Sequence, residues 1–268
     1  MDNIRIAVCI AGQPRTWERC VDSWKNLFSR FENAQVDYFY HMWDFNSLPQ
    51  ILNDFTPQPV GREEFERLHA HLLPKKHVIE NHAKSMKVIE DIRQAGQRYS
   101  ISGGTPVHWS GSQFYSSMRA SHLKREYEIE QGFQYDLCFK LRTDLYFGEF
   151  AIDQMIAEFE YPRANTIYSC HNGPADVFPF YRIGDIYYYS DSNTFDKLGD
   201  FYRWLPVIGI SPFGHDNSPP EIPFAFYINM MMINNISKTA DPKVMRTDEY
   251  AVKKNEQGKG LLGGHELT

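Results

Sequence analysis

Two cations and a carboxylate alternate near the end of residues 135–147, YDLCFKLRTDLYF. These are Lys140, Arg142 and Asp144, and the apolar residues before and between them repeat at the period of two that is typical of a β-strand. Charged residues on a central strand need a partner, because such strands are usually apolar on both faces. Ligands of open α/β sheets bind outside the carboxyl ends of the strands, so we expect a ligand site here. The alternative is an ion pair on a solvated edge strand.

A strand, a tight turn and a helix open the chain. Residues 4–11 are apolar, the sequence GQPR follows, and apolar residues then recur at helical spacing over residues 17–28. The turn is neither a GxGxxG nor a Walker sequence, so it does not indicate dinucleotide or P-loop chemistry. Gly12 would let the backbone approach a ligand closely. Arg15 either reaches a phosphate near the helix N-terminus or is simply solvated.

Asp44 follows a second predicted strand, residues 36–43. A carboxylate at the end of a second parallel strand often accepts hydrogen bonds from a ribose or a base. It can equally cap the turn or helix that follows. A third short strand is predicted at residues 78–80, after a peripheral helical segment.

A long helix precedes the charged strand. It is predicted over residues 113–131, with Ser112 as its N-cap after a Gly/Ser-rich loop at residues 99–112. A helix that leads directly into the next parallel strand is a right-handed crossover unit. The start of the helix, with Gln113, is therefore expected at the same sheet edge as the charged residues of that strand.

The second half of the chain alternates short elements with polar loops. Helices are predicted at residues 152–159, 192–204 and 223–234, and strands at 165–169 and 181–189. The loops between them carry candidate carboxylates, Asp176 in residues 171–179 and Glu221 in residues 206–223.

Composition excludes several classes of protein. Hydrophobic residues make up 42% of the 268 residues, which is enough for a sizeable core, and the net charge of −6 argues against a nucleic-acid-binding surface. The four cysteines lack metal-ligand spacing and are interpreted as buried, reduced thiols. The N-terminal apolar run is short and interrupted by Arg5, so it is interpreted as a strand rather than a signal peptide, and no stretch reaches membrane-spanning length. We expect a soluble cytoplasmic protein.

Four segments together carry a family resemblance: AGQPRTW after the first strand, HMWD at the end of the second, SQFYS at the start of the long helix, and YDLCFKLRTDLYF. This combination resembles a group of bacterial and viral GT-A-type glycosyltransferases, over most of residues 4–235. The resemblance implies one Rossmann-like GT-A domain over residues 1–268, an α/β fold whose mixed, mostly parallel sheet is flanked by helices. Residues 1–147 would bind the nucleotide-sugar, residues 148–235 would form the acceptor side, and residues 236–268 would be a C-terminal tail.

The resemblance also implies a diphosphate site with an altered motif. Arg142-Thr143-Asp144 stands where such enzymes commonly carry Asp-x-Asp, and Asp144 matches the last aspartate, which contacts a divalent cation, Mn²⁺ or Mg²⁺, on the diphosphate. Arg142 replaces the first aspartate. Its guanidinium would either assist the metal or replace it by binding the diphosphate bidentately.

The remaining roles follow from the same resemblance. Gly12, Gln13 and Arg15 would hold the nucleotide, Asp44 would contact the nucleoside, and Gln113 would face the sugar. The general base of an inverting enzyme would be Glu221, with Asp176 as second choice.

The predicted activity is transfer of a sugar from a UDP- or GDP-linked donor to a hydroxyl of a glycan or another acceptor, with no nucleic-acid partner. Two alternatives remain open. A nucleotidyltransferase can share a Rossmann-like first half, and a non-catalytic nucleotide-sugar-binding module would explain the missing first aspartate.

Overall fold

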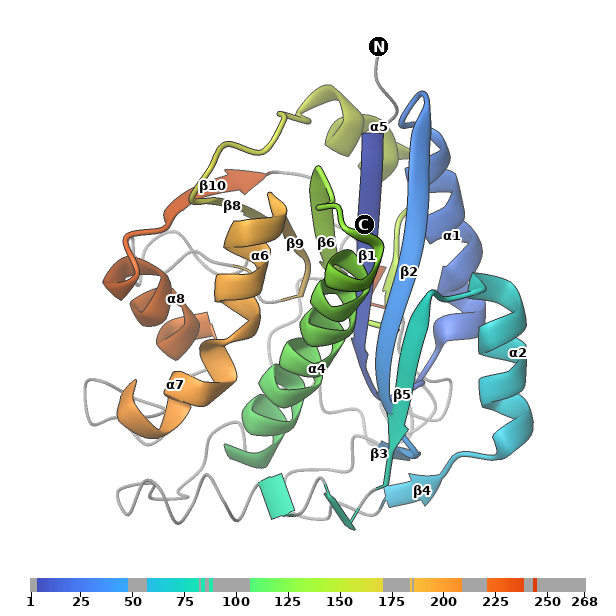
Figure 1. Cartoon of the computed structure of the whole chain (residues 1–268). Coiled ribbons are helices and arrows are strands. Elements are labelled where there is room, and N and C mark those ends of the chain that lie inside the picture. Colours follow the sequence, from blue (N-terminus) through green and yellow to red (C-terminus); the bar gives the residue numbers. More distant parts are fainter. Residues whose placement is uncertain are drawn as a thin grey trace, which may run out of the picture.

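A seven-stranded, mostly parallel sheet forms the centre of the computed structural model (Figure 1). The structure describes residues 4–47, 57–81, 83–84, 87–88, 107–170, 184, 186–208, 221–238 and 243–244. In spatial order the strands are β10 (Asn234–Lys238), β8 (Thr166–Cys170), β9 (Tyr188–Ser190), β6 (Leu137–Leu141), β1 (Ile4–Gly12), β2 (Ala34–Trp43) and β5 (Lys76–Glu80). Strand β9 runs antiparallel to both of its neighbours, whereas the other described pairs of this sheet are parallel. The predicted mixed, mostly parallel α/β sheet is therefore confirmed.

Helices and short strands complete the described part of the fold. In chain order they are α1 (Trp17–Ser29), β3 (Phe45–Ser47), β4 (Pro57–Pro59), α2 (Arg62–Leu72), α4 (Val107–Gln131), β7 (Leu145–Tyr146), α5 (Glu149–Ala157), α6 (Ser192–Gly199), α7 (Phe201–Ile208), α8 (Glu221–Met230) and β11 (Lys243–Val244). None of the helices described is both long and apolar enough to cross a membrane. All four cysteines are free and buried, as the sequence predicts.

Strand β1 separates two hydrophobic cores by simple alternation. Ile6, Val8 and Ile10 pack with the apolar stripe of α1, whereas the smaller Ala7 and Cys9 pack with residues of α4. Small side chains on the second face let α4 approach closely, and the Cys9 thiol donates to the backbone oxygen of Ala120, 3.7 Å away. Helices α1 and α4 therefore cover opposite faces of the sheet (Figure 1).

The connections create a topological switch point between β1 and β6. From β1 the chain passes through α1 to β2, and through α2 to β5, moving steadily toward one edge of the sheet. Helix α4 then returns across the opposite face and leads into β6, on the other side of β1. The chain leaves β1 and β6 in different directions, and ligands of such sheets bind outside the carboxyl ends of the strands at this point.

The first half follows the predicted elements, except for the unpredicted short strands β3 and β4 and for the start of α4. This helix begins at Val107, not after residue 112, so Ser112 lies inside the helix and is not its N-cap. The Gly/Ser composition of this segment is typical of a loop. A helix can still begin at Val107, because no proline follows Pro106 within α4 and a glycine within a helix costs only about 1 kcal/mol.

The second half departs further from the prediction. Residues 192–204 form two helices, α6 and α7, with Asp200 between them. The strand expected at 181–189 is limited, among the described residues, to β9, and the helix expected at 223–234 ends at Met230 before the unexpected strand β10. The end of α6 packs closely against α4. A Cβ on Gly199 would lie 2.6 Å from the Ser121 hydroxyl, so a glycine is needed where α6 meets α4.

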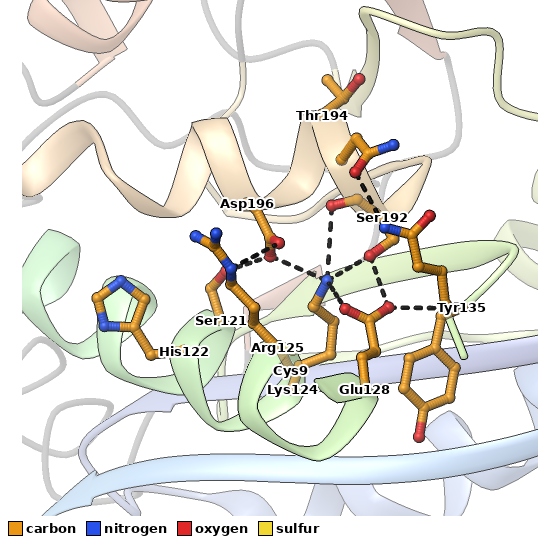
Figure 2. A network of polar contacts seen from close by, with 12 residues as sticks. Cys9, Ser121, His122, Lys124, Arg125, Glu128, Tyr135, Ser192, Thr194 and Asp196 are labelled. Carbon is orange, nitrogen blue, oxygen red and sulfur yellow. Dashed lines mark hydrogen bonds and ion pairs between the residues drawn. The ribbon is translucent and has the colours of Figure 1, made fainter. Parts of the chain in front are cut away.

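A buried lysine joins α4 to α6 (Figure 2). The Lys124 side chain is fully buried, and its ammonium lies 2.9 Å from carboxylate oxygens of both Glu128 and Asp196. The Ser192 hydroxyl accepts from Lys124 and donates to Glu128, whose carboxylate also accepts from the backbone N–H of Tyr135. Because every charge has a partner from another turn or element, the network fixes α6 against α4.

We expect Lys124→Met to lower the free energy of unfolding by about 3–5 kcal/mol, because it leaves two carboxylates buried without their cation. Urea unfolding monitored by far-UV circular dichroism would measure the loss. The matched control is Arg125→Met, since Arg125 also pairs with Asp196 but its side chain is 56% exposed. That change should cost less than about 1 kcal/mol. Equal losses in the two variants would contradict a structural role for the buried lysine.

Candidate functional site

The turn after β1 has an unusual backbone. Gly12 has φ 127° and Arg15 has φ 48°, so both adopt conformations with positive φ. Open space surrounds the position that a Cβ would take on Gly12, so its backbone angle, not crowding, favours glycine there. The left-handed conformation is uncommon for a residue with a side chain, and the backbone N–H of Arg15 donates to Asn46 Oδ1 at 2.7 Å. This contact holds the turn where Arg15 can face β6.

The turn after β6 is bound directly to the turn after β1. The Thr143 hydroxyl donates to the backbone oxygen of Gln13. Farther along, the indole N–H of Trp24 in α1 donates to the backbone oxygen of Leu145 at 2.6 Å. The turns after β1 and β6 are thus fixed to each other, and the segment after β6 is also fixed to α1.

Asp144 lies at the centre of this junction. Its Oδ1 accepts from Arg142 Nε at 2.9 Å, and its Oδ2 accepts from Arg142 Nη2 at 2.6 Å and from Arg15 Nη1 at 2.6 Å. These distances bring Arg15, Arg142 and Asp144 together at one edge of the sheet. Burial alone would raise the pKa of Asp144, but attraction and hydrogen bonds from the two guanidiniums outweigh it and hold the pKa well below its usual range.

The exposed part of this cluster is cationic. Only 5% of the Asp144 side chain is exposed, against 37% for Arg15 and 22% for Arg142. A ligand that arrives from solvent therefore meets the guanidiniums before it meets the carboxylate. Planar guanidiniums suit the oxygens of phosphates, which accept paired hydrogen bonds.

The described residues do not fit the divalent cation predicted at Asp144. Both oxygens of this carboxylate accept from guanidiniums, and a cation bound there would lie next to two positive charges. Within the described ranges, no group of three or more His, Cys, Asp or Glu side chains could hold a metal ion.

The other predicted site residues lie around the same edge or outside the described residues. Asp44 lies at the end of β2, where its Oδ2 accepts from Asn81 at 2.8 Å. Gln113 is in α4, and its backbone oxygen accepts from the Ser117 hydroxyl. Glu221 is the first residue of α8, and its side chain, like all of Asp176, lies outside the described residues.

A second buried carboxylate, Glu80, ends β5 and was not predicted as a site residue. Its oxygens lie 2.8 Å from Lys84 Nζ, 3.3 Å from Arg119 Nε, 3.0 Å from the Tyr115 hydroxyl and 3.7 Å from His41 Nε2. Burial would raise the pKa of Glu80, but the nearby His41 ring and the contacts with Lys84 and Tyr115 lower it to about 2. Because Tyr115 and Arg119 belong to α4, this cluster fastens the N-terminal half of that helix to the ends of β2 and β5.

Part of this cluster could have been found from the sequence. Glu80 stands at the end of a predicted strand, as Asp44 does, and a carboxylate at that position is expected at the edge of the sheet where ligands bind. Asn46 and Thr143 stand within or beside the predicted motifs, but their roles depend on contacts 31 and 130 residues away along the chain. No local pattern marks such contacts.

The strand order and crossovers define a Rossmann-like α/β fold with its candidate site at the switch point. No protein-family model and no curated protein matches the sequence. Among solved structures, mouse Xyloside xylosyltransferase 1 in its apo form is similar at 13% identity and a TM-score of 0.44, covering 89% of this chain and 85% of that one. A glycosyltransferase involved in the glycosylation of the major capsid of PBCV-1 is similar at 10% identity and a TM-score of 0.39, covering 87% and 82%. These scores assign the chain neither a family nor an activity.

We expect Glu80→Gln to lower the free energy of unfolding at pH 7 by about 3 kcal/mol, the value of a shift from the ordinary pKa of 4.5 to about 2. A lowered pKa stabilises the fold fully above pH 4.5, and this contribution is lost as the pH falls toward 2. The difference between wild type and variant should therefore shrink by about 1.4 kcal/mol per pH unit below 4.5, as measured by urea unfolding at pH 7 and pH 3.5.

The control for this variant is Glu66→Gln. Glu66 also accepts from an arginine, Arg62, but its side chain is 60% exposed. This change should cost less than about 0.5 kcal/mol at either pH. A pH-independent loss in Glu80→Gln would mean that packing, not charge, explains the effect.

Proposed function

We propose that this protein is a glycosyltransferase that moves a sugar from a nucleotide-sugar donor to a hydroxyl of a glycan or another acceptor. One observation carries the proposal: two partly exposed guanidiniums, Arg15 and Arg142, are held by one buried carboxylate at the switch point of a Rossmann-like sheet. A nucleotide-sugar brings a diphosphate to such a position. The sequence resemblance to GT-A-type glycosyltransferases supports the same reading.

The arginines have a direct role in the proposed reaction. The acceptor oxygen forms a bond to the anomeric carbon of the sugar, while the bond from that carbon to the diphosphate oxygen breaks. The nucleoside diphosphate leaves with more negative charge than the donor carried, and guanidiniums at this position stabilise that charge as it develops.

Other residues receive roles from the resemblance and from their place in the chain. Gly12 and Gln13 would border the nucleotide through their backbone, Asp44 would accept from the nucleoside, and Gln113 would face the sugar. In this proposal residues 1–147 bind the donor, residues 148–235 form the acceptor side, and 236–268 form the tail. Glu221, or otherwise Asp176, would take the proton of the acceptor hydroxyl if the enzyme inverts the anomeric centre.

Release of UDP or GDP from a panel of UDP- and GDP-sugars, with a mixture of glycan acceptors, tests the proposed activity. We expect release by the wild type and a fall in kcat/KM of about 10- to 100-fold in Arg15→Ala, because one charge-assisted contact to the leaving group is lost. Conversion of a donor and added pyrophosphate to UTP or GTP and a sugar 1-phosphate would favour a nucleotidyltransferase. Donor binding without turnover would favour a non-catalytic module.

The matched control for this experiment is Arg30→Ala. Arg30 follows α1 at its far end, about 20 Å along the helix from Arg15, and pairs with Glu149 on the surface. Its removal changes the net charge equally but should leave kcat/KM within about twofold, because exposed charges at that distance are largely screened. A similar fall in both variants would reduce the role of Arg15 to a general charge effect.

We expect Glu221→Gln to retain donor binding and to lose transfer by at least about 100-fold, since an amide cannot accept the acceptor proton. Isothermal titration with the donor measures binding, and product formation measures transfer. The same change at Asp176 provides the comparison. Normal transfer in Glu221→Gln, with loss in Asp176→Asn, would assign the base to Asp176.

A further inference from the structure

The position of a divalent cation is already filled by protein groups at Asp144. The Arg142 guanidinium donates one hydrogen bond to each carboxylate oxygen, and Arg15 donates a second hydrogen bond to Oδ2. A cation that binds Asp144 would have to displace these bonds while remaining close to both guanidiniums. The arrangement therefore disfavours the metal site that an aspartate at this position implies.

The charges of the cluster already match those of a metal site. One divalent cation on one carboxylate leaves a net charge of +1. Two guanidiniums on one carboxylate, Arg15 and Arg142 on Asp144, also leave +1. The cluster thus offers a diphosphate the same net charge, and it offers planar N–H donors in place of metal–oxygen bonds.

The two guanidiniums are held in place before a ligand arrives. Arg142 is oriented by its two hydrogen bonds to Asp144, and Arg15 by Asp144 together with the Asn46 contact that fixes its backbone. Side-chain exposure rises from 5% at Asp144 to 22% and 37% at the arginines, so the carboxylate lies behind the cations. Donors fixed in advance bind an anion without the cost of ordering them.

We infer that this site binds the diphosphate group of its ligand without a divalent cation, with Arg15 and Arg142 as its contacts and Asp144 as a positioning residue that orients both guanidiniums. The choice of a nucleoside diphosphate as ligand rests on the proposed function. Independence from metal rests on the geometry around Asp144.

Isothermal titration of metal-stripped protein with UDP and with GDP tests the inference, first in EDTA and then in 5 mM MnCl₂ or MgCl₂ (about the usual assay range). We expect the Kd of the better ligand to agree within about twofold in EDTA and in metal, and Arg15→Ala and Arg142→Ala each to weaken it about tenfold or more in EDTA. Arg142→Lys should also weaken binding, because a lysine keeps the charge but loses the paired hydrogen bonds of the guanidinium.

Asp144→Asn separates the two roles of the carboxylate. If Asp144 is a positioning residue, Asp144→Asn should weaken binding by the same factor in EDTA and in metal, so the ratio of the two Kd values stays near one. If Asp144 is a metal ligand, the wild type should bind about tenfold or more tightly in metal than in EDTA, and Asp144→Asn should abolish that gain. If Asp144→Asn does not fold, the ratio of the two Kd values in Arg142→Lys distinguishes the roles, because a metal-binding Asp144 would keep a metal-dependent gain of about tenfold or more in that variant, whereas a positioning Asp144 would leave the ratio near one.

The outcomes distinguish the inference from the proposed function. Binding of UDP or GDP that requires Mn²⁺ or Mg²⁺ would overturn the inference and leave the proposed function standing. Absence of binding by either nucleotide, with and without metal, would overturn the proposed function as well. Metal-independent binding that Arg15→Ala and Arg142→Ala leave unchanged would also overturn the inference, since the ligand would then bind elsewhere.

Discussion

The carboxylate of Asp144 joins the ends of the two strands between which the sheet changes direction. Its two oxygens hold Arg142 and Arg15, and the neighbouring Thr143 hydroxyl binds the turn that carries Arg15. None of these groups would be stable alone. A buried carboxylate without cations would lose its charge, and two adjacent guanidiniums without a carboxylate would repel each other. The geometry of the candidate site therefore depends on this one shared interaction.

Three buried charges organise the described part of the molecule, and they differ in what surrounds them. Lys124 is enclosed by partners from α4 and α6, and Glu80 by partners from β2, α4 and the segment after β5. Both fix one element against another. Around Asp144 the partners are themselves partly exposed, so the same chemistry presents cations to solvent. The cations beside Glu80, which are Lys84 and Arg119, are also partly exposed, so it is the place of the Asp144 cluster at the switch point between β1 and β6 that marks the candidate site.

Much of the first half could be predicted from the sequence. The alternation in β1 and the helical spacing of α1 are local patterns, and parallel strands bring their carboxyl ends to one edge, so the turns after β1 and β6 were expected on the same side of the sheet. The predicted start of α4 and the predicted single helix over residues 192–204 were wrong, because composition and periodicity do not record the packing of one element against another. The close approach of Gly199 to Ser121 is one such contact.

The sequence by itself determined the main strands and helices of residues 1–147 and the kinds of charge at the ends of β1 and β6, because both depend on local patterns of a few residues. Only the tertiary structure decided which charges pair. Ser192 lies 68 residues from Lys124, and Arg15 lies 129 from Asp144. Partner choice over such separations depends on how close the folded elements bring the side chains. That choice turned Asp144 from an expected metal ligand into the anchor of two arginines.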